Sequence, residues 1–397
     1  MGIVYLKELC GLASLLLSIV YLAFISLGLP DGLLGAAWPV MHAEIAAPLP
    51  AAGVISFIIT IGTILSSLAS DWLTSRLGAG KVTAISVLLT AAALFGFSVS
   101  TAFWQLCLWA LPYGLGAGAI DAALNNYVAL HYKARHMSWL HCFWGVGASV
   151  GPYIMGACLS RSGTWENGYR IVSLIQITLT LILFLSLPLW KRPQTSEDGA
   201  PAQTIGIAQA LRIRGVKEVL FAFFAYCAAE MTAMLWSATY LTEYRHFPAA
   251  DAASLASLFY LGMMVGRLIS GFIADRIRDR NMIRAGLGVA TVGLILILLP
   301  LGGNIAAIVG IFVLGLGCAP VYPSIIHATP VHFGAENSGA IIGIEMAAAY
   351  TGSCLMPPVF GLIAGYISAG WFPVYIAFFL MILLMMSERL NRITKTT

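Results

Sequence analysis

The sequence predicts an all-α membrane protein with twelve transmembrane helices. Hydrophobic residues make up 59% of the 397 residues and charged residues only 10%, whereas soluble domains carry roughly 25% charged residues. A helix needs about 20 apolar residues to cross the hydrocarbon core of a bilayer. Long unbroken apolar runs, such as 171–190 and 285–301, favour such helices over the alternating strands of a barrel.

The first apolar run begins after Lys7 and continues past Asp31 without a small-x-small cleavage site, so we expect a retained helix and not a signal peptide. Pro30 and Gly32 predict a break within this helix, where a carboxylate and freed carbonyls could face a cavity. Each later run is bounded by charge, Pro or Gly. The predicted helices are 10–42, 50–75, 81–100, 102–131, 137–160, 168–190, 216–245, 250–277, 281–300, 303–332, 336–366 and 370–392.

Charged connections alternate with nearly uncharged ones, which predicts the orientation of the helices. The positive-inside rule places both termini in the cytoplasm. The expected cytoplasmic cations are Lys7, Arg76, Lys81, Lys133, Arg135, Lys191, Arg192, Arg212, Arg214, Lys217, Arg276, Arg278, Arg280, Arg284, Arg389, Arg392 and Lys395, against Arg161, Arg170 and Arg245 on the other side.

The longest polar stretch, 191–217, reads as a cytoplasmic linker between two halves of six helices, 1–190 and 218–397. Residues 205–213 within this linker could form a short surface helix. Repeated motifs at an offset of about 200 residues support the two halves. The matched pairs are Gly114-Leu-Gly116 with Gly315-Leu-Gly317, Gly147-x4-Pro152-x3-Gly156 with Gly352-x4-Pro357-x3-Gly361, and Asp31 and Trp38 with Glu230 and Trp236. Parallel repeats of this kind are typical of transporters that hold substrate between the halves.

The segment Gly271-Phe-Ile-Ala-Asp275-Arg276 resembles the loop motif Gly-x-x-x-Asp-Arg of the major facilitator superfamily. The first-half copy keeps Asp71 and Arg76, but it has Ser67 and Trp72 where Gly and Arg are usual. Within that superfamily the chain is similar to the fucose permease branch of bacterial sugar:proton symporters. The stretches that carry this similarity are Gly-Leu-Pro-Asp31-Gly, Gly-x-Gly-x-x-x-x-Asp121-Ala-Ala-x-Asn125, Tyr226-x-x-x-Glu230 and Gly266-Arg267-x-x-x-Gly271.

The resemblance implies the major facilitator fold, a bacterial inner membrane, a monomer and roles for particular residues. Acidic residues in the first and fourth helices of that branch serve sugar binding and proton coupling, and they fall on Asp31 and Asp121. A glutamine of the fifth helix that contacts sugar in the fucose permease falls on His141. This difference leaves the particular sugar open.

Four acidic residues lie in expected membrane helices, namely Asp31, Asp121, Glu230 and Glu345. Charged groups at this depth are costly and usually face a protein interior or a watery cavity. We expect the first three to bind substrate and exchange protons, with H+ as the expected coupling ion and Na+ as an alternative. Glu345 could contribute to substrate binding or pair with Arg267.

Polar and aromatic side chains complete the predicted substrate site. Asn125, Asn126 and His141 offer hydrogen bonds that suit a polyol, although such residues also join membrane helices to one another. Four aromatic residues could stack on a sugar ring or simply pack, namely Trp38, Trp144, Trp236 and Tyr322.

We expect the charged residues near the cytoplasmic helix ends to form a latch or gate and not a substrate site. This set consists of Asp71, Arg76, Arg267, Asp275 and Arg276. Gly147, Gly151 and Pro152 resemble a motif of drug antiporters, although close helix packing also accounts for small residues there.

Motifs of enzymes are missing from the sequence, including the P-loop and His-Glu-x-x-His. The seven cysteines all lie in apolar segments without metal-ligand spacing, so we expect neither a metal nor a cofactor. We therefore predict a secondary transporter that moves a neutral sugar together with protons. The alternatives are a proton-coupled antiporter that exports a drug or metabolite, and a transporter-like sugar sensor.

Overall fold

The computed structural model describes residues 2–48, 51–162, 164–190, 205–247, 249–299 and 304–394, and it contains no strand within them. The helices of the first half are α1 Gly2–Gly28, α2 Leu33–Glu44, α3 Ala52–Leu77, α4 Ala79–Ser98, α5 Phe103–His131, α6 Ala134–Ser162 and α7 Trp165–Ser186. Those that follow are α8 Ile207–Ala210, α9 Val216–Thr239, α10 Ala249–Ile273, α11 Asp279–Leu298, α12 Ile305–Cys318, α13 Val321–Phe333, α14 Ala335–Tyr366 and α15 Phe372–Ile393.

Within these described ranges, eleven spans are long and apolar enough to cross a membrane, and Ser257–Ile273 of α10 is a shorter apolar helix. The all-α class with twelve membrane helices is therefore confirmed. Proline accounts for two departures from straight helices. The predicted break after α1 occurs at Leu29–Gly32, and the predicted helix 303–332 bends between α12 and α13 at Ala319–Pro320.

The predicted linker lies only partly within the described residues. Residues 191–204 fall outside them, and the short helix expected at 205–213 is present as α8. Packing divides the chain into two compact units, Met1–Tyr127 with Leu140–Ile205, and Val128–Trp139 with Gly206–Thr397. The end of α5 and the start of α6 thus belong to the second unit.

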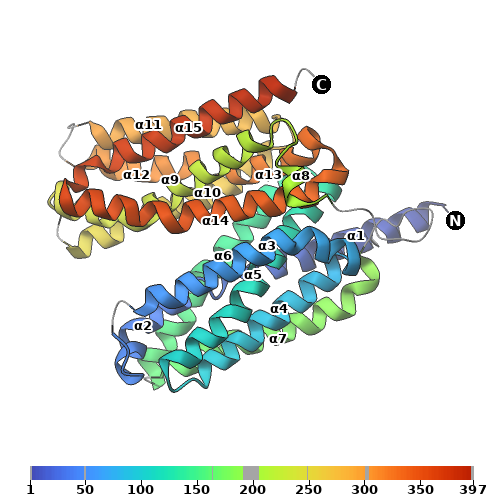
Figure 1. Ribbon diagram of the computed structural model, residues 1–397, viewed down its shortest axis with the longest axis horizontal. Coiled ribbons are helices and arrows are strands. Elements are labelled where there is room, and N and C mark those ends of the chain that lie inside the picture. Colours follow the sequence, from blue (N-terminus) through green and yellow to red (C-terminus); the bar gives the residue numbers. More distant parts are fainter. Residues whose placement is uncertain are drawn as a thin grey trace. The chain divides into compact units, whose positions relative to one another are not determined.

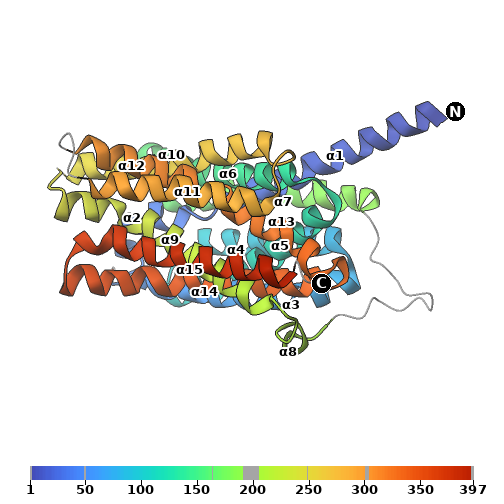
Figure 2. The ribbon, with the colours of Figure 1, turned by 90° about the horizontal axis from the view of Figure 1, so that it is seen from above.

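Within each unit the helices pack in neighbouring pairs (Figures 1 and 2). In the first unit α4 lies along α7, and α1 also contacts α7. In the second unit α9 lies between α14 and α15, while α12 packs against α10 and α11. Segments far apart in the sequence are therefore neighbours within a unit.

The repeated glycines explain how corresponding helices approach one another in each unit. A Cβ atom added at Gly114 would overlap the backbone of α3, and one at Gly116 would overlap the backbone of α4. Their counterparts repeat this pattern, because Gly315 lies against the backbone of α10 and Gly317 against that of α11. The repeat found in the sequence is thus a repeat of close helix packing.

Candidate functional site

The break between α1 and α2 places a carboxylate within a candidate membrane span, Leu15–Trp38. Pro30 has no N–H, so it cannot donate the usual helical hydrogen bond to the carbonyl of Ser26 four residues earlier. The side chain of Gln176 on α7 replaces that bond, with its Nε2 donating to the Ser26 carbonyl at 2.8 Å. Asp31 follows in the resulting turn, and its side chain is exposed.

Two aromatic side chains orient the carboxylate of Asp31. The Nε1 of Trp144 on α6 donates to Oδ2 at 2.9 Å, and the hydroxyl of Tyr113 on α5 donates to Oδ1 at 3.4 Å. The carboxylate of Asp31 is also repelled by the like charge of Asp121. Because carboxylate oxygens accept several hydrogen bonds, Asp31 can bind a further donor such as a hydroxyl group.

Close approach of α1 and α6 holds Trp144 in this position. A Cβ atom at Gly147 would overlap the carbonyl of Ile25, and one at Gly151 would overlap the carbonyl of Leu29. The small residues of the antiporter-like motif therefore have a clear packing role in this fold. They bring α6 against the end of α1, where Asp31 follows.

A cavity of about 10 Å³ lies behind this turn and has Ser26, Tyr113 and Gln176 in its lining. That volume is about the size of one water-sized probe. The Oγ of Ser26 and the Oε1 of Gln176 are buried and have no hydrogen-bond partner among the described residues. These two atoms and the Tyr113 hydroxyl are suitable partners for one water molecule.

Asp121, Asn125 and His141 form a connected, buried group in the first unit. Each is at most 5% exposed. Asn125 lies one helical turn after Asp121 on α5, and its Nδ2 donates to Asp121 Oδ1 at 2.8 Å. The Asn125 Oδ1 is then the acceptor facing His141, whose Nε2 lies 3.1 Å away and so acts as the donor. Of the predicted polar residues, the structure thus brings together Asp121, Asn125 and His141.

Asn126 points to a different side of α5 from Asn125. It occupies the next position on α5, about 100° around the helix, and it is partly exposed. The predicted stacking surfaces also differ in exposure. Trp38 is 5% exposed and belongs to the apolar core, whereas Trp144 is only half-buried.

In the second unit, Glu230 on α9 forms a buried ion pair with Arg267 on α10. The Nη2 of Arg267 lies 3.3 Å from Glu230 Oε1. Nearby, the Tyr226 hydroxyl donates to the carbonyl of Cys318 at 3.0 Å. The positions that carried the resemblance in this half are therefore close together, and Arg267 contacts the acid of α9.

Glu345, which we considered from the sequence as a partner of Arg267 or of the substrate, contacts Thr329. The Thr329 hydroxyl lies 2.8 Å and 3.0 Å from its two carboxyl oxygens, and Glu345 is fully buried. Two predicted aromatic residues of this half also make packing contacts. Trp236 donates to the carbonyl of Pro357 at 2.9 Å, and Tyr322 packs edge-on against neighbouring rings.

The predicted latch has one strong contact. Asp275 forms an ion pair with Arg135 and also accepts the backbone N–H of that residue at 3.2 Å. Asp275 thereby caps the start of α6, which begins three residues before the predicted 137. Gly271, the glycine of the loop motif, is required because Trp139 occupies the space of a Cβ atom there.

The other latch residues are arranged differently. The guanidinium of Arg76 lies over the ring of Trp72 on the same helix, 4.4 Å from the ring centre. Asp71 is half-buried on the same helix, and Arg276 is exposed. Asp275 therefore pairs with Arg135 and not with the adjacent arginine.

Sequence reasoning missed Tyr113 and Gln176, and it named Arg135 as a cytoplasmic cation but not as the partner of Asp275. The signal for Gln176 was its position as a lone amide in an apolar helix, together with the proline four residues after Ser26. Tyr113 and Arg135 could not be found in this way, because their partners are distant in the sequence. No three metal-ligating side chains are grouped in the described part of the chain.

Comparison with known proteins gives the family. The family model described as Major Facilitator Superfamily matches residues 20–344 and again 219–395. An uncharacterized MFS-type transporter of Yersinia pestis is 26% identical over 348 residues, which cover 84% of this chain and 86% of the relative. A probable hexose phosphate transport protein of Chlamydia pneumoniae is 22% identical over 62% of this chain and 60% of its own length.

Solved structures agree with this assignment at the level of the fold. The E. coli fucose:proton symporter FucP has a TM-score of 0.77 at 15% identity, covering 95% of this chain and 98% of that one. The proton:xylose symporter XylE has a TM-score of 0.74 at 11% identity, covering 94% of each chain. The chain belongs to the major facilitator superfamily and is a membrane transporter, not an enzyme.

Proposed function

We propose that this transporter carries a neutral sugar together with protons, and that Asp31 and Asp121 are the residues that couple the two. The observation that carries this proposal is the pair of acids in the first unit. Asp31 is exposed at a broken helix, and Asp121 is buried and interacts with it electrostatically. We assign sugar binding to Asp31 and proton binding to Asp121.

Charge explains how binding of the two ligands would be linked. Two nearby carboxylates repel each other, so a proton on Asp121 favours the charged form of Asp31. A charged Asp31 accepts a stronger hydrogen bond from a sugar hydroxyl than a neutral one does. Sugar and proton would therefore bind best together, and each would shift the conformational equilibrium in the same direction.

The polar groups around these acids suit a neutral sugar. Trp144 holds Asp31 from one side and offers a flat ring next to the carboxylate. In the second unit the one buried arginine described in a span, Arg267, is paired with Glu230, so it offers less charge to an anionic substrate. The named sugar symporters FucP and XylE share this fold.

A second candidate is transport of an anionic solute. Its support is the set of relatives whose names refer to hexose phosphate, hexuronate and cis,cis-muconate transport. Such a substrate would require Arg267 to leave Glu230, or His141 to become charged. The two candidates differ in the charge moved for each substrate molecule.

Purified protein in liposomes provides the test. With a neutral hexose, we expect Asp121→Asn to retain exchange of labelled sugar at equal pH but to lose accumulation driven by a pH gradient. Asp31→Asn should lose both activities. Glu336→Gln, which alters an exposed acid in the first turn of α14, is the matched control and should retain both. Proton-driven accumulation by Asp121→Asn would refute the assignment.

The same vesicles resolve the remaining alternatives. An imposed Na+ gradient in place of the pH gradient distinguishes the coupling ion, and vesicles of known orientation distinguish uptake from export. We further propose a monomer without cofactor in a bacterial inner membrane, with both termini cytoplasmic. The functional halves would be 1–190 and 218–397, joined by the linker 191–217.

A further inference from the structure

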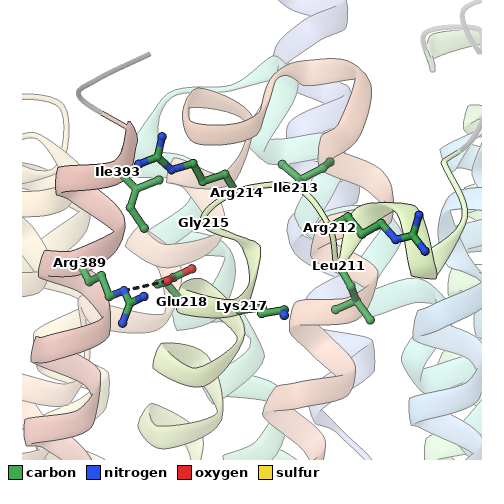
Figure 3. Close-up of a pocket in the computed structure, with 9 residues that line it drawn as sticks. All are labelled: Leu211, Arg212, Ile213, Arg214, Gly215, Lys217, Glu218, Arg389 and Ile393. Atoms are coloured by element: carbon green, nitrogen blue, oxygen red, sulfur yellow. Dashed lines mark ion pairs between the residues drawn. The ribbon is translucent and has the colours of Figure 1, made fainter.

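A basic pocket lies in the second unit, at the start of α9 (Figure 3). Its volume is about 590 Å³. The turn 211–215 after α8, the start of α9 and the end of α15 form its lining. On the orientation proposed above, these helix ends lie at the cytoplasmic surface of the membrane.

Positive charge dominates the pocket. Its lining contains Arg212, Arg214, Lys217 and Arg389, and the carboxylate of Glu218 is the one acidic group among them. Glu218 is bonded to Arg389, with 3.0 Å between Oε1 and Nε. The other three cations are exposed and form no ion pair with any residue that the structure describes. An anion in the pocket would therefore meet cations that have no carboxylate partner in this part of the chain.

The start of α9 adds a second attraction for an anion. Gly215 precedes the helix with a φ of +98°, a left-handed conformation that favours glycine, and no side chain caps the first turn. The N–H groups of a helix start are without helical partners and carry partial positive charge. Phosphate groups bind at such helix starts.

We infer that this pocket binds a phosphate group, and that the natural source is the headgroup of an anionic phospholipid. Leu211, Ile213 and Ile393 also line the pocket, so it offers apolar contacts beside the cations, as a lipid requires. Basic pockets beside transmembrane helices on the cytoplasmic side are suited to such headgroups. A bound headgroup would contact the turn 211–215, the start of α9 and the end of α15 at the same time.

Native protein in detergent tests this inference through its thermal unfolding midpoint. Short-chain phosphatidylglycerol is titrated, with phosphatidylcholine of the same chain length as the uncharged comparison. The test variant carries Arg212→Gln, Arg214→Gln and Lys217→Gln. The control variant carries Lys81→Gln, Lys133→Gln and Arg278→Gln, which remove the same charge from other cytoplasmic positions.

We expect phosphatidylglycerol to raise the midpoint of the wild type and of the control variant. In the test variant the apparent affinity should fall roughly tenfold to a hundredfold, because each basic side chain near an anionic surface contributes about a factor of five. Equal losses in the test and control variants would overturn the inference, since they would show attraction by total charge and not by this pocket. No difference between the two lipids in the wild type would also overturn it.

A titration with inorganic phosphate distinguishes a lipid headgroup from a soluble ligand as the source of the bound phosphate group. Stabilisation by phosphatidylglycerol without an effect of millimolar phosphate supports the lipid headgroup. Stabilisation by phosphate alone, lost in the test variant, supports the phosphate site but assigns it to a soluble ligand and refutes the lipid source. None of these readouts depends on transport, so failure of the proposed function would leave them unchanged.

Discussion

The buried pair of Glu230 and Arg267 predicts an asymmetric response to mutation. Glu230→Leu leaves the Arg267 guanidinium buried, and arginine cannot lose its charge in a protein. Removing one partner of a buried ion pair costs about 3–5 kcal/mol. Arg267→Met instead leaves the carboxyl group of Glu230 buried, and this group can become neutral by taking up a proton. We therefore expect Glu230→Leu to destabilise the protein more than Arg267→Met.

The double variant sharpens this prediction. Replacing both partners by apolar residues removes both charges of this pair, and such replacements are often neutral or stabilising. The two residues are almost fully buried, with side-chain exposures of 11% for Glu230 and 6% for Arg267. The combined variant should therefore be more stable than Glu230→Leu alone.

Thermal unfolding in detergent measures these differences. For a unit of about 200 residues, 1 kcal/mol corresponds to about 2–4 °C, so Glu230→Leu should lower the midpoint by roughly 6–20 °C. The double variant should recover at least half of that loss. Additive losses in the double variant would refute the reasoning, because they would show that the two side chains do not depend on each other.

Three further predictions concern the contacts around the first site and the loop motif. Gly151→Val should weaken transport and stability because its side chain would separate α6 from α1, whereas Gly156→Val, which has open space, should leave both unchanged; transport assays and unfolding midpoints compare them. Gln176→Leu should cost about 1–3 kcal/mol, measured by unfolding, because the Ser26 carbonyl would lose its donor. Asp275→Asn should weaken the cap of α6, and increased amide exchange at its first turn would show this.

The sequence predicted the all-α membrane fold well because membrane helices follow from the length of apolar segments. The break at Asp31 was also predictable, because Pro30 acts on its own helix. The bend at Ala319–Pro320 has the same local cause but was not anticipated. Such features depend on one segment at a time.

Features that depend on distant partners were harder to predict. The start of α6 lies earlier than expected because Asp275 caps it, and no local pattern in the sequence indicates a cap from a distant turn. Trp38, which from the sequence could stack on a sugar ring or pack, lies in the core. The pairing of Arg267 with Glu230 likewise depends on how the helices pack.

The most direct test of proton-coupled sugar transport uses the wild-type protein in lightly buffered liposomes. Neutral hexoses are added one at a time at equal internal and external pH, and the external pH is recorded together with sugar uptake. Coupled uptake predicts that a transported sugar makes the external medium more alkaline, with proton and sugar entry at a fixed ratio. Sugar uptake without any change in external pH would contradict proton coupling through Asp31 and Asp121.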